Sequence, residues 1–193
     1  MSSEMTAEMY LPHFVVKQKL TMMVNRYEVS ESDEAGNPTR LMALAEQKRM
    51  AFKEQVTFYA DAAKTRAVFG FKARRKLDLN AGYDITDETG AQIGFFRKDF
   101  GASLLRSTFH VEGPGYTGTG RERSQLVGLL RRFTELDFIP IHFDFVDSAG
   151  QPLFSVERKM SIGDRYRVTV PDQRVDFRVA AAVAVGLDAL MAR

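Results

Sequence analysis

The stretch that decides the fold is Asp176-Phe-Arg-Val-Ala-Ala-Ala-Val-Ala-Val-Gly-Leu-Asp-Ala-Leu190, close to the end of the 193-residue chain. Asp176 is a suitable N-cap for a helix, and residues 179–187 then contain no polar side chain. A helix that is apolar on all sides lies either in a protein core or in a membrane. Because a membrane span needs about 20 apolar residues, this shorter run predicts a core helix. Val183 and Val185 lie on different sides of that helix, and we expect both to be buried.

A turn motif recurs along the chain. The stretch Tyr83-Asp-Ile-Thr-Asp-Glu-Thr-Gly90 reappears as Phe143-Asp-Phe-Val-Asp-Ser-Ala-Gly150 and, more loosely, as Tyr27-Glu-Val-Ser-Glu-Ser-Asp-Glu-Ala-Gly36. In each copy an aromatic residue starts a short alternating run, and Asp comes three residues before Gly. Asp at the first position of a type I turn accepts backbone hydrogen bonds, and Gly at the fourth position adopts the left-handed conformation that closes a hairpin. The motif therefore predicts hairpins repeated around a closed or strongly curved sheet, with structural roles for Asp87, Asp147, Gly36, Gly90 and Gly150.

Most other segments are rich in β-forming residues. We expect strands over residues 13–20, 22–29, 56–59, 67–73, 103–111 and 165–170, with a further turn over residues 61–64. Residues 44–55 are helix formers, and Ser124 could cap a helix reaching Phe133, so one or two short helices are expected as well. The first residues, MSSEMTAEM, are polar and acidic. Residues 1–12 are therefore expected to form a disordered tail, and residues 13–193 a single mainly β domain.

Composition excludes several classes of site. The chain has no Cys, which rules out disulfides, thiolate metal ligands and cysteine nucleophiles and fits a reducing cytoplasm. The net charge of +2 conceals a basic region between positions 40 and 76, where ten Lys and Arg accompany three Asp and Glu. This regional excess of positive charge makes residues 40–76 the candidate region for a binding surface.

The densest basic cluster consists of Lys72, Arg74, Arg75 and Lys76, at the end of a predicted strand. Alternation along the strand places Lys72 and Arg74 opposite Phe71, so both cations point to solvent if Phe71 is buried. Such cations could contact lipid phosphates. The alternative is a solvated strand face that protects a sheet edge from aggregation. Nucleic acid is not expected as a partner, because no aromatic residues interleave with these charges.

Other motifs give no sign of catalysis. Residues 113–118, Gly-Pro-Gly-Tyr-Thr-Gly, have the spacing GxGxxG, but further residues separate them from the helix predicted at Ser124. A loop leading to that helix explains them better than a dinucleotide site does. His13, His110 and His142 are scattered and are expected to be structural. No nucleophile elbow, zinc-protease motif or P-loop occurs, so we predict no catalytic residue, no metal and no cofactor.

Several segments together resemble bacterial members of the LURP-one-related family, which is akin to phospholipid scramblases and to the tubby C-terminal domain. The matching pieces span most of residues 13–191 and are Phe71-Lys-Ala-Arg-Arg75, the turn ending at Gly90, Lys98-Asp-Phe-Gly-Ala-Ser-Leu-Leu-Arg-Ser107, His142-Phe-Asp-Phe-Val-Asp147, Glu157-Arg-Lys159, Asp164-Arg-Tyr-Arg-Val168 and the closing helix. The resemblance implies a closed antiparallel β-barrel of about twelve strands around a central apolar C-terminal helix. It also implies contact with membrane phospholipid, since tubby domains bind phosphoinositide head groups.

The chain departs from the scramblase pattern in two respects. Scramblases carry a cysteine cluster for acylation and an acidic calcium loop before the last helix, whereas this chain has no Cys and one carboxylate in residues 168–174. We therefore expect a non-enzymatic binding module, cytoplasmic or peripheral at the inner membrane face, that contacts anionic phospholipid head groups or a membrane-surface partner. The alternatives are an intracellular protein-interaction or oligomerisation domain and an enzyme with an unrecognised pocket.

Overall fold

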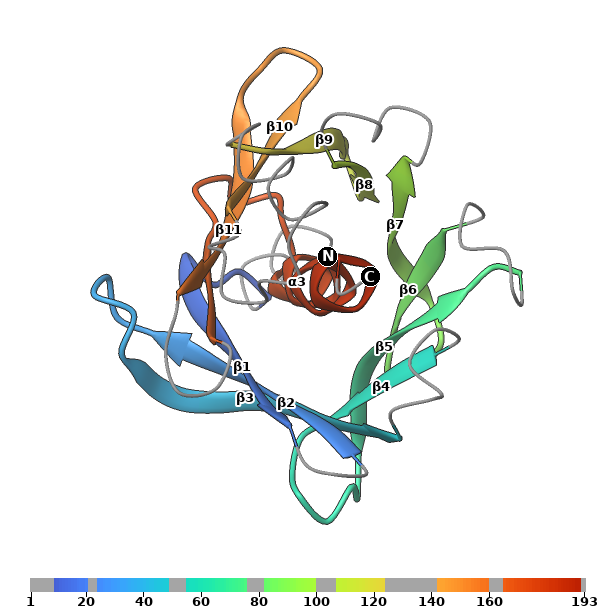
Figure 1. Cartoon of the computed structure of the whole chain (residues 1–193). Coiled ribbons are helices and arrows are strands. Elements are labelled where there is room, and N and C mark those ends of the chain that lie inside the picture. Colours follow the sequence, from blue (N-terminus) through green and yellow to red (C-terminus); the bar gives the residue numbers. More distant parts are fainter. Residues whose placement is uncertain are drawn as a thin grey trace, which may run out of the picture.

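The computed structural model describes residues 9–20, 24–48, 55–75, 82–99, 107–123, 142–159 and 165–191. These residues form twelve β-strands and one α-helix (Figure 1). In chain order the elements are β1 (His13–Leu20), β2 (Val24–Ser32), β3 (Pro38–Lys48), β4 (Gln55–Tyr59), β5 (Ala67–Ala73), β6 (Tyr83–Asp87), β7 (Gln92–Asp99), β8 (Thr108–Gly113), β9 (Tyr116–Glu122), β10 (His142–Asp147), β11 (Pro152–Lys159), β12 (Arg165–Thr169) and α3 (Phe177–Met191).

The twelve strands form a closed, antiparallel barrel, as the resemblance implies. Each strand pairs with its neighbours in the sequence, and β1 closes the sheet against β12, where His13 lies opposite Thr169. Strand β5 is hydrogen-bonded to β4 on one side and to β6 on the other. The basic cluster on β5 therefore does not protect a sheet edge, because β5 is not an edge strand.

Helix α3 occupies the centre of the barrel (Figure 1). Residues 179–185 are 0% exposed, so Val183 and Val185 are both buried although they lie on different sides of the helix. Asp176 caps the helix, and its Oδ1 atom accepts a hydrogen bond of 2.8 Å from the backbone N–H of Arg178. Among the described residues, we find no helix with both the length and the hydropathy that crossing a membrane requires. The predicted core helix is confirmed.

Small residues allow α3 to approach the sheet closely. A methyl group built on Gly94 of β7 would lie 2.9 Å from the Val179 side chain, and one built on Gly186 of α3 would lie 2.5 Å from the Phe96 ring. Contacts this short are incompatible with close-packed atoms, so glycine is required at both positions. Large strand side chains fill the space that the alanines of α3 leave, as in the stacked rings of Phe145 and Phe154, whose centroids are 4.3 Å apart.

The hairpin turns have the geometry that the repeated motif predicts. Gly36, Gly90 and Gly150 have φ angles of 86°, 84° and 78°. Oδ1 of Asp87 accepts hydrogen bonds from the backbone N–H groups two and four residues later, at 2.9 and 3.0 Å. Asp147 makes the same pair of contacts, each at 2.9 Å. The turn predicted over residues 61–64 is also present, with a Lys in the left-handed position in place of Gly.

The two ends of the barrel differ. At one end, which we call the turn end, the turns over residues 33–36, 61–64, 87–90, 113–116 and 147–150 join consecutive strands, and α3 begins. At the other end, which we call the loop end, α3 finishes, and Nζ of Lys98 on β7 donates a hydrogen bond of 3.0 Å to the carbonyl oxygen of Leu190. Of the connections between strands at the loop end, residues 21–23, 49–54, 76–81, 100–106, 124–141 and 160–164 lie outside the described residues.

One predicted helix is wrong. Residues 44–48 belong to β3, and Gln55 begins β4. Helix propensity is a weak preference, and pairing with β2 overrides it here, since Ala43 and Ala45 lie inside the barrel opposite Val29 and Tyr27. The helix predicted from Ser124 lies outside the described residues.

The loop predicted over residues 113–118 is also corrected. Gly113 and Tyr116 flank the turn between β8 and β9, and β9 continues directly from it. The GxGxxG spacing arises because Gly115, with a φ angle of 78°, closes the turn, while Gly118 lies within β9. No helix N-terminus follows the third glycine, so the geometry of a dinucleotide site is absent from this hairpin.

The segment before β1 packs against the start of α3. The carbonyl oxygen of Met9 accepts a hydrogen bond of 2.9 Å from the N–H of Phe177, and the Tyr10 hydroxyl donates one of 2.9 Å to the carbonyl oxygen of Val170. Leu11 is buried in the main core. Residues 9–12, expected to be part of a disordered tail, therefore contribute to the packing of the turn end, whereas residues 1–8 lie outside the described residues.

Candidate functional site

Strand β5 presents the candidate cations on the outside of the barrel. Phe71 is 2% exposed and contacts the rings of Tyr83 and Phe96 inside. Lys72, the next residue, is exposed, as alternation along the strand requires. Arg74 and Arg75 are exposed just beyond the end of the strand, and Lys76 lies outside the described residues.

Lys72 borders an open groove on the outer face of the barrel. The side chain has neither an ion pair nor a hydrogen bond with any described residue, and in the sheet it lies between Gln55 of β4 and Asp84 of β6. The groove has a volume of about 450 Å³ and runs across β4, β5 and β6. Gly70 lies in the middle of this lining, and a methyl group there would lie 2.7 Å from the backbone carbonyl oxygen of Val56 on β4, so the close approach of the two strands requires glycine.

Arg74 is held in place by two contacts. Its guanidinium forms an ion pair of 2.8 Å with Asp84 and lies 3.9 Å from the centre of the Phe95 ring. The hydrogen bond with Asp84 raises the pKa of Arg74 above its ordinary value. The Phe95 ring in turn packs over Gly82, where a methyl group would lie 2.5 Å from the ring. Arg74 therefore forms a fixed wall of the groove, whereas no described residue holds the Lys72 side chain by an ion pair or a hydrogen bond.

Sequence reasoning missed Asp84 and Phe95 as partners of the cluster. Both residues lie on strands that follow β5, and their contact with Arg74 depends on the register between strands. A weak signal existed for Phe95, because β7 carries two adjacent buried aromatic residues, Phe95 and Phe96, and an alternating strand can direct only one of them inward. The outer Phe95 therefore needs a cover, which Arg74 supplies.

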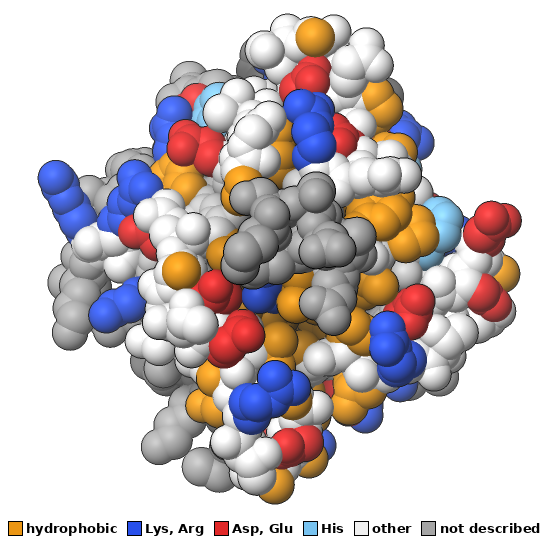
Figure 2. Space-filling view, turned by 180° about the vertical axis from the view of Figure 1, so that it is seen from behind, with side chains coloured by type: hydrophobic (Ala, Val, Ile, Leu, Met, Phe, Trp, Pro, Cys, Tyr) orange, Lys and Arg blue, Asp and Glu red, His pale blue; other side chains and the backbone are white. Residues whose placement is uncertain are grey.

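The groove does not have a uniform charge. Asp87 and Glu88 line it toward the turn end, and Lys72, Arg74 and Asp84, which is paired with Arg74, line it toward the loop end. On the face shown in Figure 2, too, Lys and Arg side chains lie beside Asp and Glu side chains and do not form one continuous block. An anionic ligand would therefore contact the loop end of the groove and not its whole length.

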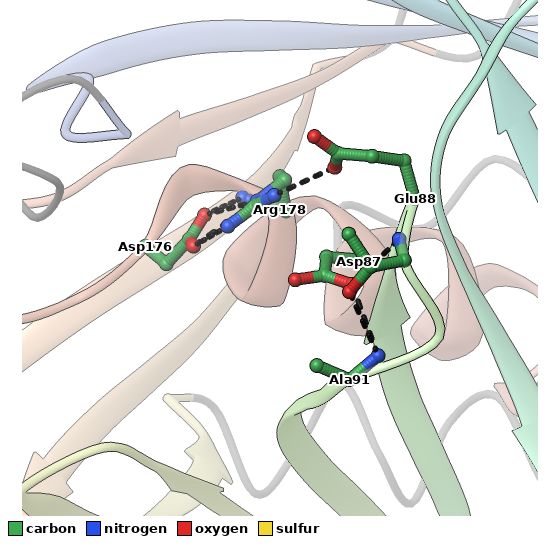
Figure 3. A network of polar contacts seen from close by, with 6 residues as sticks. Asp87, Glu88, Ala91, Asp176 and Arg178 are labelled. Carbon is green, nitrogen blue, oxygen red and sulfur yellow. Dashed lines mark hydrogen bonds and ion pairs between the residues drawn. The ribbon is translucent and has the colours of Figure 1, made fainter.

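The acidic end of the groove is part of a network that anchors α3 (Figure 3). Arg178 is 8% exposed and binds Asp176 through two nitrogen atoms, at 3.1 and 2.7 Å. It also lies 3.5 Å from Glu88 in the β6–β7 turn. Buried charges are stable when they are paired in this way, so this network is better explained as structural than as a binding site.

A second arginine makes a similar link four residues earlier. Arg174 forms ion pairs with Asp172, at 2.6 Å, and with Asp147 in the β10–β11 turn, at 3.5 Å. It also donates a hydrogen bond of 3.3 Å to the carbonyl oxygen of Gly115 in the β8–β9 turn. Scramblases carry a calcium loop in the segment that corresponds to residues 168–174. Asp172 is the one carboxylate of that segment in this chain, and it forms an ion pair with Arg174.

The histidines lie on separate strands. His13 is on β1, His110 on β8 and His142 on β10, and the Nε2 atom of His110 lies 3.2 Å from Asp99. Within the described residues, no group of three or more His, Asp or Glu side chains could hold a metal ion. The structure thus brings none of the three histidines together with a second one.

Comparison with known proteins fixes the family. A family model described as LURP-one-related matches residues 42–188, which extend from β3 into α3. The chain belongs to the LURP-one-related family. No curated protein matches it significantly. A porin-like protein from Bacteroides uniformis is similar over 82% of this chain and 96% of its own, at 8% identity, but the TM-score of 0.23 is too low to support an argument.

The family match extends over all of the groove in this LURP-one-related barrel. Strands β4, β5 and β6 lie within the matched residues 42–188, as do the start of α3 and both arginines that anchor it. The N-terminal segment, β1 and β2 precede the match, yet they complete the barrel and cover one side of α3. The folded unit is therefore larger than the matched region.

Proposed function

We propose that this LURP-one-related barrel is a non-enzymatic binding domain that contacts anionic phospholipid head groups at the loop end of β5. The observation that carries the proposal is Lys72, an exposed cation with no partner among the described residues, at the border of an open groove. Arg75 is exposed nearby, and Lys76 follows it in the sequence. Each cation near an anionic membrane surface contributes about 1 kcal/mol of binding free energy.

The four residues of the cluster have different parts in this proposal. Lys72 would contact phosphate groups directly, and Arg75 and Lys76, which follow it closely in the sequence, would add positive charge beside it. Arg74 would contribute less, because Asp84 already neutralises it and the Phe95 ring fixes its position. Its role would be to shape the groove beside Lys72.

Co-sedimentation with vesicles tests the proposal. The wild-type protein is mixed with phosphatidylcholine vesicles, with and without phosphatidylserine, at low and at high salt. We expect binding only with phosphatidylserine, and weaker binding as salt rises, because ions screen interactions between exposed charges.

Two double variants locate the contact. Lys72→Gln with Arg75→Gln removes two cations of the cluster, and Arg40→Gln with Arg66→Gln removes two exposed cations at the turn end. The first variant should bind weakly and the second should bind like the wild type, with both folded by circular dichroism. Equal binding by all three proteins, or no binding by the wild type, would overturn the proposal. Binding that is insensitive to salt would instead favour an apolar interface with a protein partner.

A further inference from the structure

The groove over β4, β5 and β6 has charges of opposite sign at its two ends. Lys72, which has neither an ion pair nor a hydrogen bond with any described residue, lines it toward the loop end, and Glu88 lines it toward the turn end. In the β5–β6 pair, Lys72 lies opposite Asp84, and Phe69 lies opposite Asp87. The turn that carries Glu88 therefore begins three residues from the level of Lys72, about 10 Å along the strand. A single phosphate group cannot contact both ends.

Two hydroxyl groups lie between the charged ends. Thr57 of β4 and Thr86 of β6 lie on either side of Gly70 in the sheet, and all three residues line the groove. The Thr57 hydroxyl accepts a hydrogen bond of 3.4 Å from Gln55, which leaves its own proton available to a ligand. The Thr86 hydroxyl has no partner among the described residues. These two donors, one row away from Lys72, can complete a site for phosphate oxygens.

The turn end of the groove has an excess of negative charge. Arg178 binds Asp176 at 3.1 and 2.7 Å and reaches one oxygen of Glu88 at 3.5 Å. Because Asp87 lies in the same turn as Glu88, three carboxylates face one guanidinium, which leaves a net charge of −2. The other oxygen of Glu88 points away from Arg178 (Figure 3), and 43% of this side chain is exposed. Glu88 can therefore bind a cationic group while Arg178 keeps its structural role.

We propose, resting on the proposed function above, that the groove binds the head group of an aminophospholipid, with its phosphate at Lys72 and the two threonines and its primary ammonium at Glu88. In such a head group a short carbon chain joins the phosphate to the ammonium, so one ligand carries both charges that the groove complements. Phosphatidylserine has both groups and also a net negative charge. The groove volume of about 450 Å³ is within the range of small-molecule sites.

The lining distinguishes a primary ammonium from choline. A primary ammonium donates hydrogen bonds to a carboxylate, whereas the methylated ammonium of choline has no proton to donate and is bound by exposed aromatic rings. The aromatic residues along the groove, Phe69 and Phe71, are 1% and 2% exposed and face the barrel interior. The described lining therefore offers no aromatic cage, and phosphatidylcholine should not bind.

Two anionic lipids of equal charge test the inference. Phosphatidylserine and phosphatidylglycerol have the same net charge, but only phosphatidylserine has an ammonium group. Binding of the wild type is measured on phosphatidylcholine vesicles that contain the same mole fraction of either lipid. We expect binding to phosphatidylserine to be about fivefold tighter, the effect of one partly exposed ion pair.

Three variants locate the ammonium contact, each checked for folding by circular dichroism. Glu88→Gln should abolish the preference for phosphatidylserine, because an amide has no charge to attract the ammonium. The readout is the ratio of the two affinities, since loss of a carboxylate strengthens binding to any anionic surface. Glu34→Gln removes an exposed carboxylate from the β2–β3 turn and is the matched control, which should keep the wild-type ratio. Thr86→Val should weaken binding to both lipids and leave the ratio unchanged.

Soluble head groups test whether the groove itself is the site, without a membrane and in the wild-type protein. Glycerophosphoserine should shift the backbone amide resonances of Thr86 and Glu88 in NMR titrations and leave that of Glu34 unchanged. Glycerophosphoglycerol, which lacks the ammonium, should shift the resonance of Thr86 but not that of Glu88. Equal shifts at Glu88 with the two compounds would contradict the inference.

The outcomes separate this inference from the proposed function. If the wild type binds both anionic lipids equally well, and Lys72→Gln with Arg75→Gln weakens both, charge alone attracts the lipid, and the inference fails while the proposed function stands. A preference for phosphatidylserine that survives in Glu88→Gln also contradicts the inference. If the wild type binds neither lipid, both proposals fail.

Discussion

The phenol of Tyr27 on β2 donates a hydrogen bond of 2.9 Å to Oδ2 of Asp188, the first polar residue after the apolar run of α3. Tyr166 on β12 donates to the other oxygen of the same carboxylate. Strands β2 and β12 are the two neighbours of β1, so the two tyrosines bind the Asp188 carboxylate from opposite sides of β1. These contacts set the depth and rotation of α3 in a barrel whose other contacts with the helix are largely apolar and non-directional.

Removing one of these phenol groups should destabilise the fold. Tyr27→Phe leaves the Asp188 carboxylate and the amide of Gln18, which donates to Tyr27 at 3.1 Å, without that partner. We expect the free energy of unfolding to fall by about 1–3 kcal/mol in urea titrations, because a buried polar group loses its hydrogen bond. Tyr10→Phe, which removes a partly buried bond to a backbone carbonyl, is the control and should cost less. Equal losses in the two variants would argue against a special role of the Asp188 contacts.

A charge on either side of α3 should prevent folding. Val183 and Val185 are about 200° apart around the helix axis, and both are 0% exposed. Val183→Asp and Val185→Asp would each bury an unpaired carboxylate, at a cost of several kcal/mol that approaches the whole stability of a domain. We expect insoluble or unfolded protein in both cases, and also after deletion of residues 176–193. Val146→Asp, on the outer face of β10, is the control. Near-normal melting of either helix variant would mean that one side of α3 is exposed.

Replacing a turn glycine by a β-branched residue should destabilise the fold through backbone strain alone. At Gly90 and Gly150 an added methyl group would meet no atom within 4 Å, so steric clashes with the rest of the protein do not contribute. Val at either position should lower the free energy of unfolding by about 1–2 kcal/mol, since a β-branched residue tolerates positive φ poorly. Asn adopts this conformation more readily than other residues. Gly90→Asn should therefore cost clearly less than Gly90→Val by chemical denaturation, and the reverse order would contradict the turn argument.

Acid should weaken the turns at residues 33–36 and 61–64. The side-chain hydrogen bond from Thr65 holds the pKa of Asp61 below its ordinary value of 3.8, and the one from Asn37 does the same for the pKa of Asp33. A carboxylate with a lowered pKa stabilises the folded state above its unfolded pKa, and this contribution is lost as pH falls through the folded pKa. Asp61→Asn should therefore be less stable than the wild type at neutral pH, and the difference should shrink below pH 3.8. Urea titrations at neutral pH and below pH 3.8 measure this difference in the free energy of unfolding, with Glu34→Gln in a neighbouring turn as the control. A difference that stays constant with pH would show that the charge of Asp61 is not the cause.

The features of this structure that could be predicted are those that depend only on residues close together in the sequence. The apolar character of residues 179–187 is visible without any partner, and the turn at residues 87–90 needs four residues. The ion pair between Arg74 and Asp84 could not be predicted, because it depends on the register of β5 against β6. The bond between Tyr27 and Asp188 joins residues 161 positions apart. The helix predicted over residues 44–48 was wrong for the same reason, since local propensity favours a helix and only the pairing with β2 makes these residues a strand.

The closure of the barrel by β1 and β12, around a helix that comes last in the chain, has a consequence for folding during synthesis. The Tyr10 hydroxyl and its partner, the carbonyl oxygen of Val170, are 160 residues apart, and all twelve strands precede α3 in the chain. While the chain is being synthesised, the strands leave the ribosome with inward aromatic side chains that have no helix to pack against. Contacts between distant residues form slowly, and exposed apolar strands aggregate readily. The order of the elements therefore leaves these aromatic side chains without their packing partner until the 15 residues of α3 have been synthesised.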